Sequence, residues 1–274
     1  MKTKYKITLA AFFSVIVIFG LSESTTKNGE EKIVPQETKK EAVEQKEEGG
    51  NSENRPASAL NEREKNKSEE IRATTTEVVK PRTYLQNMSF FAQAPFGEWK
   101  DPRQQDGCEE ASALMAVAWA KGEKIDKTQA KNKILEIAEF EKKKYGGYVD
   151  TDTEDTVKRI INDFLGYEQA RVVHNIVLEN IKQEIIKGNV VLVPCNGRKL
   201  GNPNYTPPGP ERHMLLIKGY DGVKEEFITN DAGTRQGENY RYKEDVVYEA
   251  IIDYPTGNHV PIEKETKSMI VVWK

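Results

Sequence analysis

The chain has 274 residues, which is long enough for one sizeable domain or two small ones. Its 41 basic and 44 acidic residues leave a net charge of only −3, and this balance argues against a nucleic-acid partner. Because the composition is uneven along the chain, the folded part has to be located before any function is assigned.

The first 24 residues have the layout of a secretory signal. Three lysines within the first six residues precede an apolar run over residues 7–21, and small or polar residues follow it. A run of about 15 residues is short for a bilayer-spanning helix, which needs roughly 20. We therefore expect residues 1–24 to be a signal peptide, with an uncleaved N-terminal membrane anchor as the alternative. Either form predicts a secreted or extracytoplasmic protein, and the second would tether it to the membrane.

Residues 25–82 are dominated by Lys, Glu, Asn, Gln and Ser and contain almost no aromatic side chains. Such a segment buries too little apolar surface to offset the entropy lost on ordering. We expect a disordered, charged linker here, with a long solvated helix as the alternative. The remaining residues, 83–274, are then the folded domain.

Helical periodicity predicts the first elements of this domain. Apolar residues recur every three or four positions over residues 108–121, and Gly122 ends the pattern. A second helix is expected over residues 126–145, because Asp126 is a suitable N-cap and two glycines follow Tyr145. Two further helices are expected in the apolar patterns that begin at Val157 and Val177.

After these helices, short runs typical of β-strands alternate with Gly, Pro and Asn turns. The runs are "NVVLVPC", "HMLLIKGYD", "EEFITND" and "MIVVW". Helices followed by an antiparallel sheet indicate the α+β class, with an N-terminal helical part packed on that sheet.

One of the two cysteines lies at the start of the first predicted helix. The unpaired N–H groups and the dipole at that position favour the thiolate of Cys108, and Gly107 permits a sharp turn before it. Glu109 and Glu110 oppose the thiolate through their negative charge. A cationic partner is therefore needed if Cys108 is to be a nucleophile.

Three histidines could supply that partner. His174 lies in a predicted strand, where a structural role is expected, and His259 lies in a loop. His213 begins the run "HMLLIKGYD" and would be held rigidly at the end of a core strand. The next strand ends at Asn230 and Asp231, where an amide or a carboxylate could accept a hydrogen bond from the imidazole and select its tautomer.

The order Cys, His, Asx is the order expected of papain-like cysteine enzymes. With the stretches "FAQAPFGEW", "GCEEAS", "ERHMLLIKGYD" and "ITNDAGT", the chain resembles the papain-like cysteine peptidases of the stand-alone C39-like (Peptidase_C39_2-like) family, which is related to the double-glycine leader peptidases. The resemblance covers most of residues 84–254. It implies a papain-like cysteine proteinase fold and thioester-forming acyl transfer without a metal or other cofactor.

The resemblance also implies roles for particular residues. Cys108 would be the nucleophile, His213 the general base and acid, and Asp231 the group that orients His213. A Gln upstream of the Cys would complete the oxyanion hole, and Gln93 best matches that motif, with Gln105 and Gln104 as alternatives. Two departures from the family pattern are the longer stretch between Gln93 and Cys108 and the Ala, in place of Pro, after Asp231.

We therefore expect an exported cysteine peptidase or amide hydrolase that acts on a peptide or protein substrate as a monomer, without nucleic acid. The alternative is a catalytically silent papain-like module that binds extracellular or cell-wall peptides. Two alternatives also remain for Cys108 itself: a buried core thiol, or a disulfide with Cys195. The Pro-rich segment 197–212, which ends just before His213, is either a cover for the cleft or an ordinary surface loop.

A calcium site is the last alternative, because Asp150, Asp152, Glu154 and Asp155 lie close together in the sequence. Their spacing lacks the central Gly and terminal Glu of a calcium loop, and acidic residues are common at a helix start without any ion. We therefore expect these residues to begin a helix.

Overall fold

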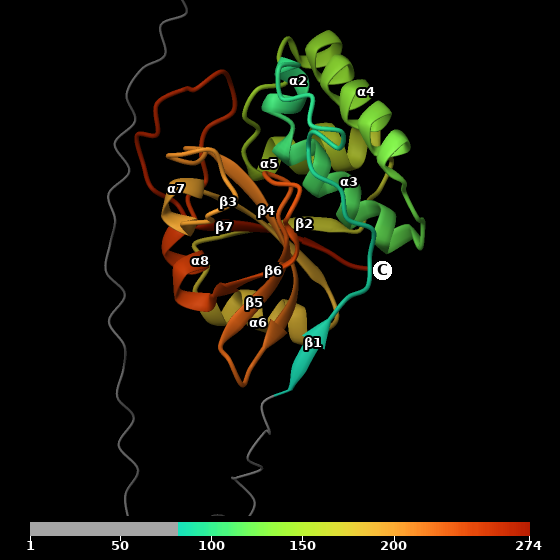
Figure 1. Cartoon of the computed structure of the whole chain (residues 1–274). Coiled ribbons are helices and arrows are strands. Elements are labelled where there is room, and N and C mark those ends of the chain that lie inside the picture. Colours follow the sequence, from blue (N-terminus) through green and yellow to red (C-terminus); the bar gives the residue numbers. More distant parts are fainter. Residues whose placement is uncertain (1–81) are drawn as a thin grey trace, which may run out of the picture. The chain divides into compact units, whose positions relative to one another are not determined.

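The computed structural model describes residues 82–274. The predicted signal or anchor over residues 1–24, and the predicted linker apart from Arg82, lie outside the described residues. The described part combines helices with one seven-stranded antiparallel sheet, which confirms the predicted α+β class (Figure 1). None of the helices in residues 82–274 is long and apolar enough to cross a membrane.

The strands form the sheet in the order β2-β7-β3-β4-β5-β6, and β1 pairs with the second half of β4. Their bounds are β1 Thr83–Leu85, β2 Ala170–His174, β3 Val190–Cys195, β4 His213–Asp221, β5 Glu226–Asn230, β6 Glu238–Lys243 and β7 Ser268–Val272. All four runs predicted to be strands are present. The last of them, β7, lies in the interior of the sheet between β2 and β3.

The helices lie in two groups on opposite faces of this sheet (Figure 1). Their bounds are α2 Pro102–Gln105, α3 Cys108–Lys121, α4 Lys127–Tyr145, α5 Thr153–Asp155, the π-helix η1 Thr156–Phe164, α6 Leu178–Ile186, α7 Gly197–Leu200 and α8 Glu244–Ala250. The first five of these lie on one face, and α6, α7 and α8 lie on the other.

Local sequence signals explain where α3 and α4 begin and end. Helix α3 ends because Gly122 adopts a left-handed conformation and its N–H bonds to Ala118 and Trp119. Helix α4 begins with a capping box, in which the Asp126 carboxylate accepts from the N–H of Gln129 while the Gln129 side chain accepts from the N–H of Asp126. Both helices therefore match the predictions closely.

Helix η1 differs from the sequence prediction in its winding. The apolar side chains that predicted it do point inward, and Ile160 and Ile161 are fully buried. However, residues 156–164 form a wider π-helix, with the N–H of Leu165 bonding to the Ile160 carbonyl. A pattern of apolar side chains cannot distinguish this winding from an α-helix over so few turns.

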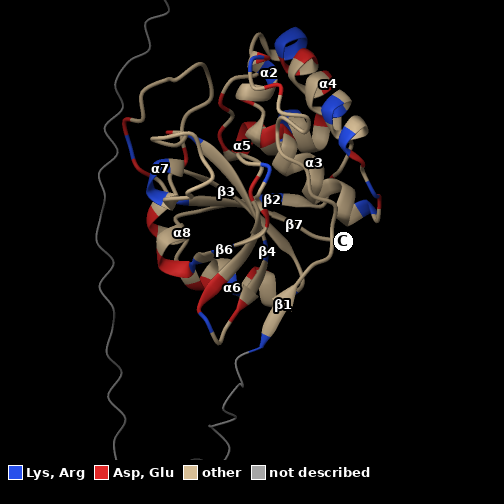
Figure 2. Ribbon diagram, viewed as in Figure 1, with Lys and Arg blue, Asp and Glu red and all other residues tan. Residues whose placement is uncertain are grey.

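Strands β3, β4 and β7 in the interior of the sheet bury both of their faces, since successive side chains point in opposite directions, whereas β6 at the edge is mostly exposed. Val190 and Leu192 of β3 pack with α3, α4 and η1, whereas Val191 and Val193 pack with α6 and α8. This arrangement gives three layers with two apolar cores. Figure 2 shows basic and acidic residues along α4, whereas Ile134 of the same helix is fully buried.

Candidate active site

Cys108 is the first residue of α3 and lies against the start of β4. Two contacts hold this arrangement: Ser112 Oγ donates to the Met214 carbonyl at 3.0 Å, and the Met214 N–H donates to Cys108 Sγ at 3.4 Å. A side chain on Gly107 would approach the Arg103 carbonyl to 2.8 Å, so glycine is needed there for space. The Cys108 side chain is 7% exposed and lines a cleft.

The Cys108 thiol donates to Glu109 Oε2 at 2.9 Å. The other oxygen of this buried carboxylate accepts from the Tyr254 hydroxyl at 2.7 Å. Burial raises the pKa of the Cys108 thiol, and the negative charge of Glu109 raises it further, although the Met214 N–H acts in the opposite direction. Burial and the charge of Glu109 therefore oppose the thiolate that the helix start favours, which agrees with the expected need for a cationic partner.

His213 and Asp231 meet because β4 and β5 are antiparallel neighbours. The start of β4 therefore lies beside the end of β5, with Leu216 opposite Asn230. His213 Nε2 and Asp231 Oδ1 are 2.9 Å apart, and both side chains are almost completely buried. This contact leaves Nδ1 of the imidazole available to another group.

Asp231 is surrounded by hydrogen-bond donors that the sequence analysis did not identify. Its Oδ2 accepts from Tyr205 at 2.6 Å, from Tyr242 at 2.6 Å and from Asn202 at 3.1 Å. Although burial raises the pKa of Asp231, the charge and hydrogen bond of His213 and the two tyrosine hydroxyls lower it to about 2 overall. Asp231 is therefore ionised at neutral pH.

The neighbouring Asn230 has a different role. Its Nδ2 donates to the Ser89 carbonyl at 3.3 Å and lies near Met115 Sδ, so it ties β5 to the chain before α2 and to α3. Of the two residues that end the predicted strand, only Asp231 contacts His213. The sequence had left the choice between an amide and a carboxylate open.

Gln93 is buried at the cleft, in the segment between β1 and α2. Its backbone N–H donates to the Ala232 carbonyl at 2.9 Å, which fixes it beside the turn that follows Asp231. Its Nε2 donates to the Gln105 carbonyl at 2.7 Å, which leaves the second hydrogen of the amide free. Gln105 also lines the cleft, whereas Gln104 is buried outside it, with Nε2 near the Glu98 carbonyl.

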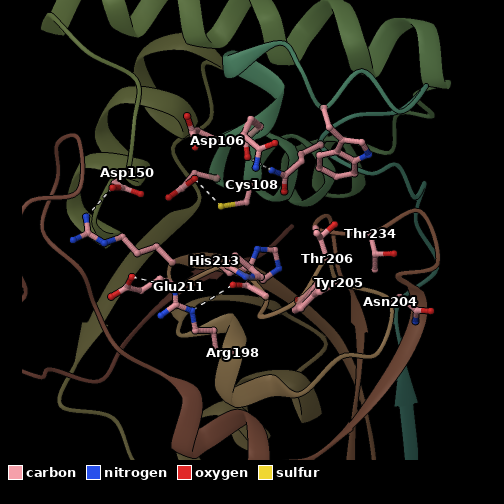
Figure 3. Close-up of a pocket in the computed structure, with 18 of the residues that line it drawn as sticks. Asp106, Cys108, Asp150, Arg198, Asn204, Tyr205, Thr206, Glu211, His213 and Thr234 are labelled. Carbon is pink, nitrogen blue, oxygen red and sulfur yellow. Dashed lines mark hydrogen bonds and ion pairs between the residues drawn. The ribbon is translucent and has the colours of Figure 1, made fainter.

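The cleft has a volume of about 900 Å³ and is lined by Gln93, Cys108, Glu109 and His213. Figure 3 shows that Cys108 and His213 enter it from opposite walls. The Pro-rich segment lies along the cleft through several of its residues, from Arg198 to Arg212. The segment therefore forms part of the wall of the cleft and is not an ordinary surface loop remote from it.

The sequence model of the Peptidase_C39 like family matches residues 85–255, which is more than half of the chain. The chain belongs to the Peptidase_C39 like family. Among curated proteins, no significant match was found. One crystal structure, of a protein from Bacillus anthracis described as a C39-like peptidase, is similar with 14% sequence identity and a TM-score of 0.47, covering 70% of this chain and 98% of the other.

The second cysteine of this C39-like chain does not form a disulfide. Cys108 and Cys195 are both free thiols. Cys108 packs in the core on the α3 face of the sheet, whereas Cys195 packs with Val193 and Leu200 in the core on the α8 face. The disulfide alternative is therefore wrong, and Cys195 is a fully buried free thiol.

The other two histidines of the family member have different surroundings. His174 lies at the end of β2, where Nδ1 bonds to Ser268 Oγ and Nε2 pairs with Glu154, which confirms its structural role. His259 lies in the loop before β7 and lines the cleft, with Nδ1 3.2 Å from Asp150 Oδ2. Asp150 also pairs with Arg212 at 2.7 Å, so it joins three loops around the cleft.

The acidic residues considered for calcium mostly have protein partners as well. Asp152 caps α5 by accepting from the N–H of Asp155 at 2.7 Å, and Asp155 pairs with Arg159 at 2.7 Å. Asp152, Glu154 and Asp155 therefore begin a helix, as the sequence analysis expected, whereas Asp150 lies before it and pairs with Arg212.

Proposed function

We propose that this family member is an active cysteine peptidase or related amide hydrolase, with Cys108 as nucleophile, His213 as general base and acid, and Asp231 as the group that orients His213. The hydrogen bond between Asp231 and His213 Nε2 is the observation that carries the proposal. It fixes the imidazole tautomer with hydrogen on Nε2, so that Nδ1 has a lone pair to accept a proton. Met214 follows His213 directly, and its N–H donates to Cys108 Sγ, so this contact holds the start of β4 against the nucleophile.

In the proposed reaction, the Cys108 sulfur attacks the carbonyl carbon of an amide while the thiol proton passes to His213 Nδ1. The oxyanion that forms accepts from the Cys108 N–H and from the free hydrogen of the Gln93 amide. His213 then protonates the leaving amine, and the C–N bond breaks to leave a thioester. Water, deprotonated by His213, hydrolyses the thioester and restores the thiol.

The charge on Asp231 supports this role for His213. Because its pKa lies at about 2, Asp231 remains an anion at neutral pH and stabilises the imidazolium that forms when His213 accepts the proton. Tyr205 and Tyr242 hold the carboxylate in place through its second oxygen. They would act as positioning residues: both bond to Asp231, and the Tyr205 ring also packs edge-on against the His213 imidazole.

The alternative of a silent binding module gains no support from the two features that would favour it. A cysteine locked in a disulfide is one of them, and Cys108 is a free thiol. A displaced glutamine is the other, and Gln93 lines the same cleft as Cys108. We therefore retain the enzyme as the proposal.

The proposal includes the setting predicted from the sequence. A peptide or protein substrate would be met outside the membrane, since residues 1–24 resemble a secretory signal or an N-terminal anchor. The protein would act as a monomer and would need no cofactor, because thioester chemistry requires only the three side chains and the oxyanion donors.

The test is cleavage of a complex peptide mixture by the full chain, with cut sites identified by mass spectrometry. We expect defined cleavage that falls by roughly a thousandfold or more in Cys108→Ala and in His213→Ala. Cys195→Ala is the matched control, since this buried cysteine lies on the other face of the sheet, and it should retain cleavage. Cleavage that persists in Cys108→Ala would contradict the proposal, and peptide binding without cleavage by the wild type would support the binding module.

A further inference from the structure

The Glu109 carboxylate directly contacts the reacting sulfur, yet the proposed reaction does not use it. It is 2% exposed, and both of its oxygens face hydrogen-bond donors: the Cys108 thiol and the Tyr254 hydroxyl. A neutral carboxyl group would have to donate through one of its oxygens, whereas a carboxylate can accept from both partners. Burial raises the pKa of the Glu109 carboxyl, whereas the hydrogen bonds from Cys108 and Tyr254 lower it, and these two contacts fit the ionised form.

The position of this carboxylate is set by segments far from α3 in the sequence. Tyr254 follows α8, is fully buried, and holds Glu109 Oε1. The guanidinium of Arg212 lies 5.8 Å from the centre of the Tyr254 ring and pairs with Asp150. Glu109 Oε2 is thereby held at the thiol by a network from four parts of the chain.

Among the described residues, the acidic side chain that contacts Cys108 Sγ is Glu109, and no hydrogen bond joins the sulfur to His213. Within residues 82–274, the hydrogen bonds of Cys108 Sγ are the one it donates to Glu109 and the one it accepts from Met214 N–H. A nucleophile stored as an ion pair would instead show the sulfur bonded to the imidazole.

We propose that Glu109 is a further catalytic residue of the reaction proposed above, on which this inference rests: it holds the Cys108 proton before a substrate binds, so that the nucleophile is stored as a neutral thiol. In the attack step the S–H bond breaks, its electron pair forms the new C–S bond, and the proton passes to His213 Nδ1. Glu109 remains a carboxylate throughout, and no oxidant or other co-reactant is needed.

The other ionisable groups around this pair are mostly acidic and come from every neighbouring element. They are Asp106 before α3, Glu110 on α3, Glu141 on α4, Asp150 after α4, Cys195 on β3, Arg212 and His213 at β4, Asp231 after β5, Tyr254 after α8 and His259 before β7. Arg212 and His259 both contact Asp150, and His213 contacts Asp231. These surroundings favour the neutral thiol, because the nearest cations already have anionic partners.

The test measures how fast Cys108 is alkylated by iodoacetamide as a function of pH, in the full chain without substrate, with labelled sites located by mass spectrometry. Glu109→Gln keeps the shape of the side chain but removes its charge and can place an N–H donor at the sulfur. We expect the midpoint of the alkylation profile to fall by about one pH unit or more, and alkylation at neutral pH to be roughly tenfold faster. An unchanged midpoint, or a midpoint moved to higher pH, would overturn the inference.

Glu110→Gln is the matched control. It changes the buried carboxyl group of the next residue in the same helix turn, but neither Glu110 oxygen bonds to the thiol. The midpoint of the Cys108 alkylation profile should therefore move less than half as far in Glu110→Gln as in Glu109→Gln. Thermal melting of each variant checks that it folds. A second measurement needs only Cys108→Ala as a reference: the wild type should show no Cys108 thiolate absorbance in the ultraviolet at neutral pH, and a thiolate signal there would overturn the inference.

Failure of this inference can be distinguished from failure of the proposed function. Thiol titration is read without substrate, whereas the function is read from cleavage in Cys108→Ala. If Glu109→Gln leaves the titration unchanged while Cys108→Ala abolishes cleavage, only the role of Glu109 is wrong. If cleavage persists in Cys108→Ala, the proposed function is wrong whatever the titration shows.

Discussion

Asp231 illustrates how strongly the property of a residue depends on its contacts. A fully buried carboxyl group in apolar surroundings would be neutral at pH 7. Here Oδ1 contacts His213 and Oδ2 accepts from three side chains, so the pKa is about 2. The adjacent Asn230 is equally buried but only ties neighbouring segments together. The chemistry of this turn thus depends on the direction in which each side chain points.

Gln93 leads to a prediction at the same scale. Gln93→Ala should lower kcat by about 10²-fold to 10³-fold, because it removes one of the two proposed oxyanion donors. Gln105→Ala is the control: it removes the competing side chain but keeps the carbonyl that holds Gln93. Steady-state kinetics on a cleaved peptide measure both variants. A larger loss in Gln105→Ala would show that Gln105 supplies the donor.

At the scale of secondary structure, α3 and α4 bury two acidic side chains that have no hydrogen-bond partner. Glu110 and Glu141 are fully buried, and all four of their carboxylate oxygens lack a partner among residues 82–274. Burial raises the pKa of Glu141 to about 8, with Glu109 adding to the effect and Arg159 opposing it. Burial, together with the charge of Glu141, also raises the pKa of Glu110. The two helices therefore pack best when these groups are protonated.

This packing predicts a pH-dependent stability. The pKa of Glu141 is raised above its ordinary value of 4.5. The contribution of the protonated carboxyl group to the free energy of unfolding is therefore fully present below pH 4.5 and is lost as the pH rises through about 8. Glu141→Gln should weaken this dependence and raise the free energy of unfolding at pH 8 by about 1–3 kcal/mol.

Urea unfolding followed by circular dichroism at several pH values measures this effect. Glu136→Gln changes an exposed glutamate of the same helix and is the control: its free energy of unfolding should depend on pH as that of the wild type does. If Glu141→Gln were less stable than the wild type at pH 8, the carboxylate would have to be ionised and satisfied in the folded protein.

For the whole molecule, the last strand is as important as the segment that carries the site. The family match ends at residue 255, yet β7 pairs with both β2 and β3 in the interior of the sheet. Four successive apolar side chains of β7, residues 269–272, are at most 2% exposed. The fold therefore extends beyond the matched family region.

A chain that ends at residue 255 should consequently fail to fold. Loss of four buried apolar side chains costs roughly 6–12 kcal/mol, which is comparable with the 5–15 kcal/mol that stabilises a typical domain. Thermal unfolding followed by circular dichroism should show no cooperative transition for this chain. Removing only the exposed Lys274 is the control and should leave the transition unchanged. A cooperative transition in the shorter chain would mean that the sheet can close without β7.

Much of the fold could be predicted because the responsible signals are local. The capping box of α4, the glycine that ends α3 and the apolar runs of β3, β4, β5 and β7 each lie within a few residues. Strands β1 and β6 and helix α8 were not predicted. The first is only three residues long, β6 is mostly exposed and polar, and α8 has no side-chain cap.

The candidate Cys and His could also be selected from the sequence, because each begins a predicted element, and the resemblance to the family implied Asp231 in place of the adjacent Asn230. Their surroundings could not be predicted: Glu109 and Tyr254 are separated by 145 residues, and Asp231 depends on Asn202, Tyr205 and Tyr242. Hydrogen bonding and burial act between groups that the folded chain brings together, so the raised pKa of the Cys108 thiol and the charge of Asp231 follow from the packing of the fold.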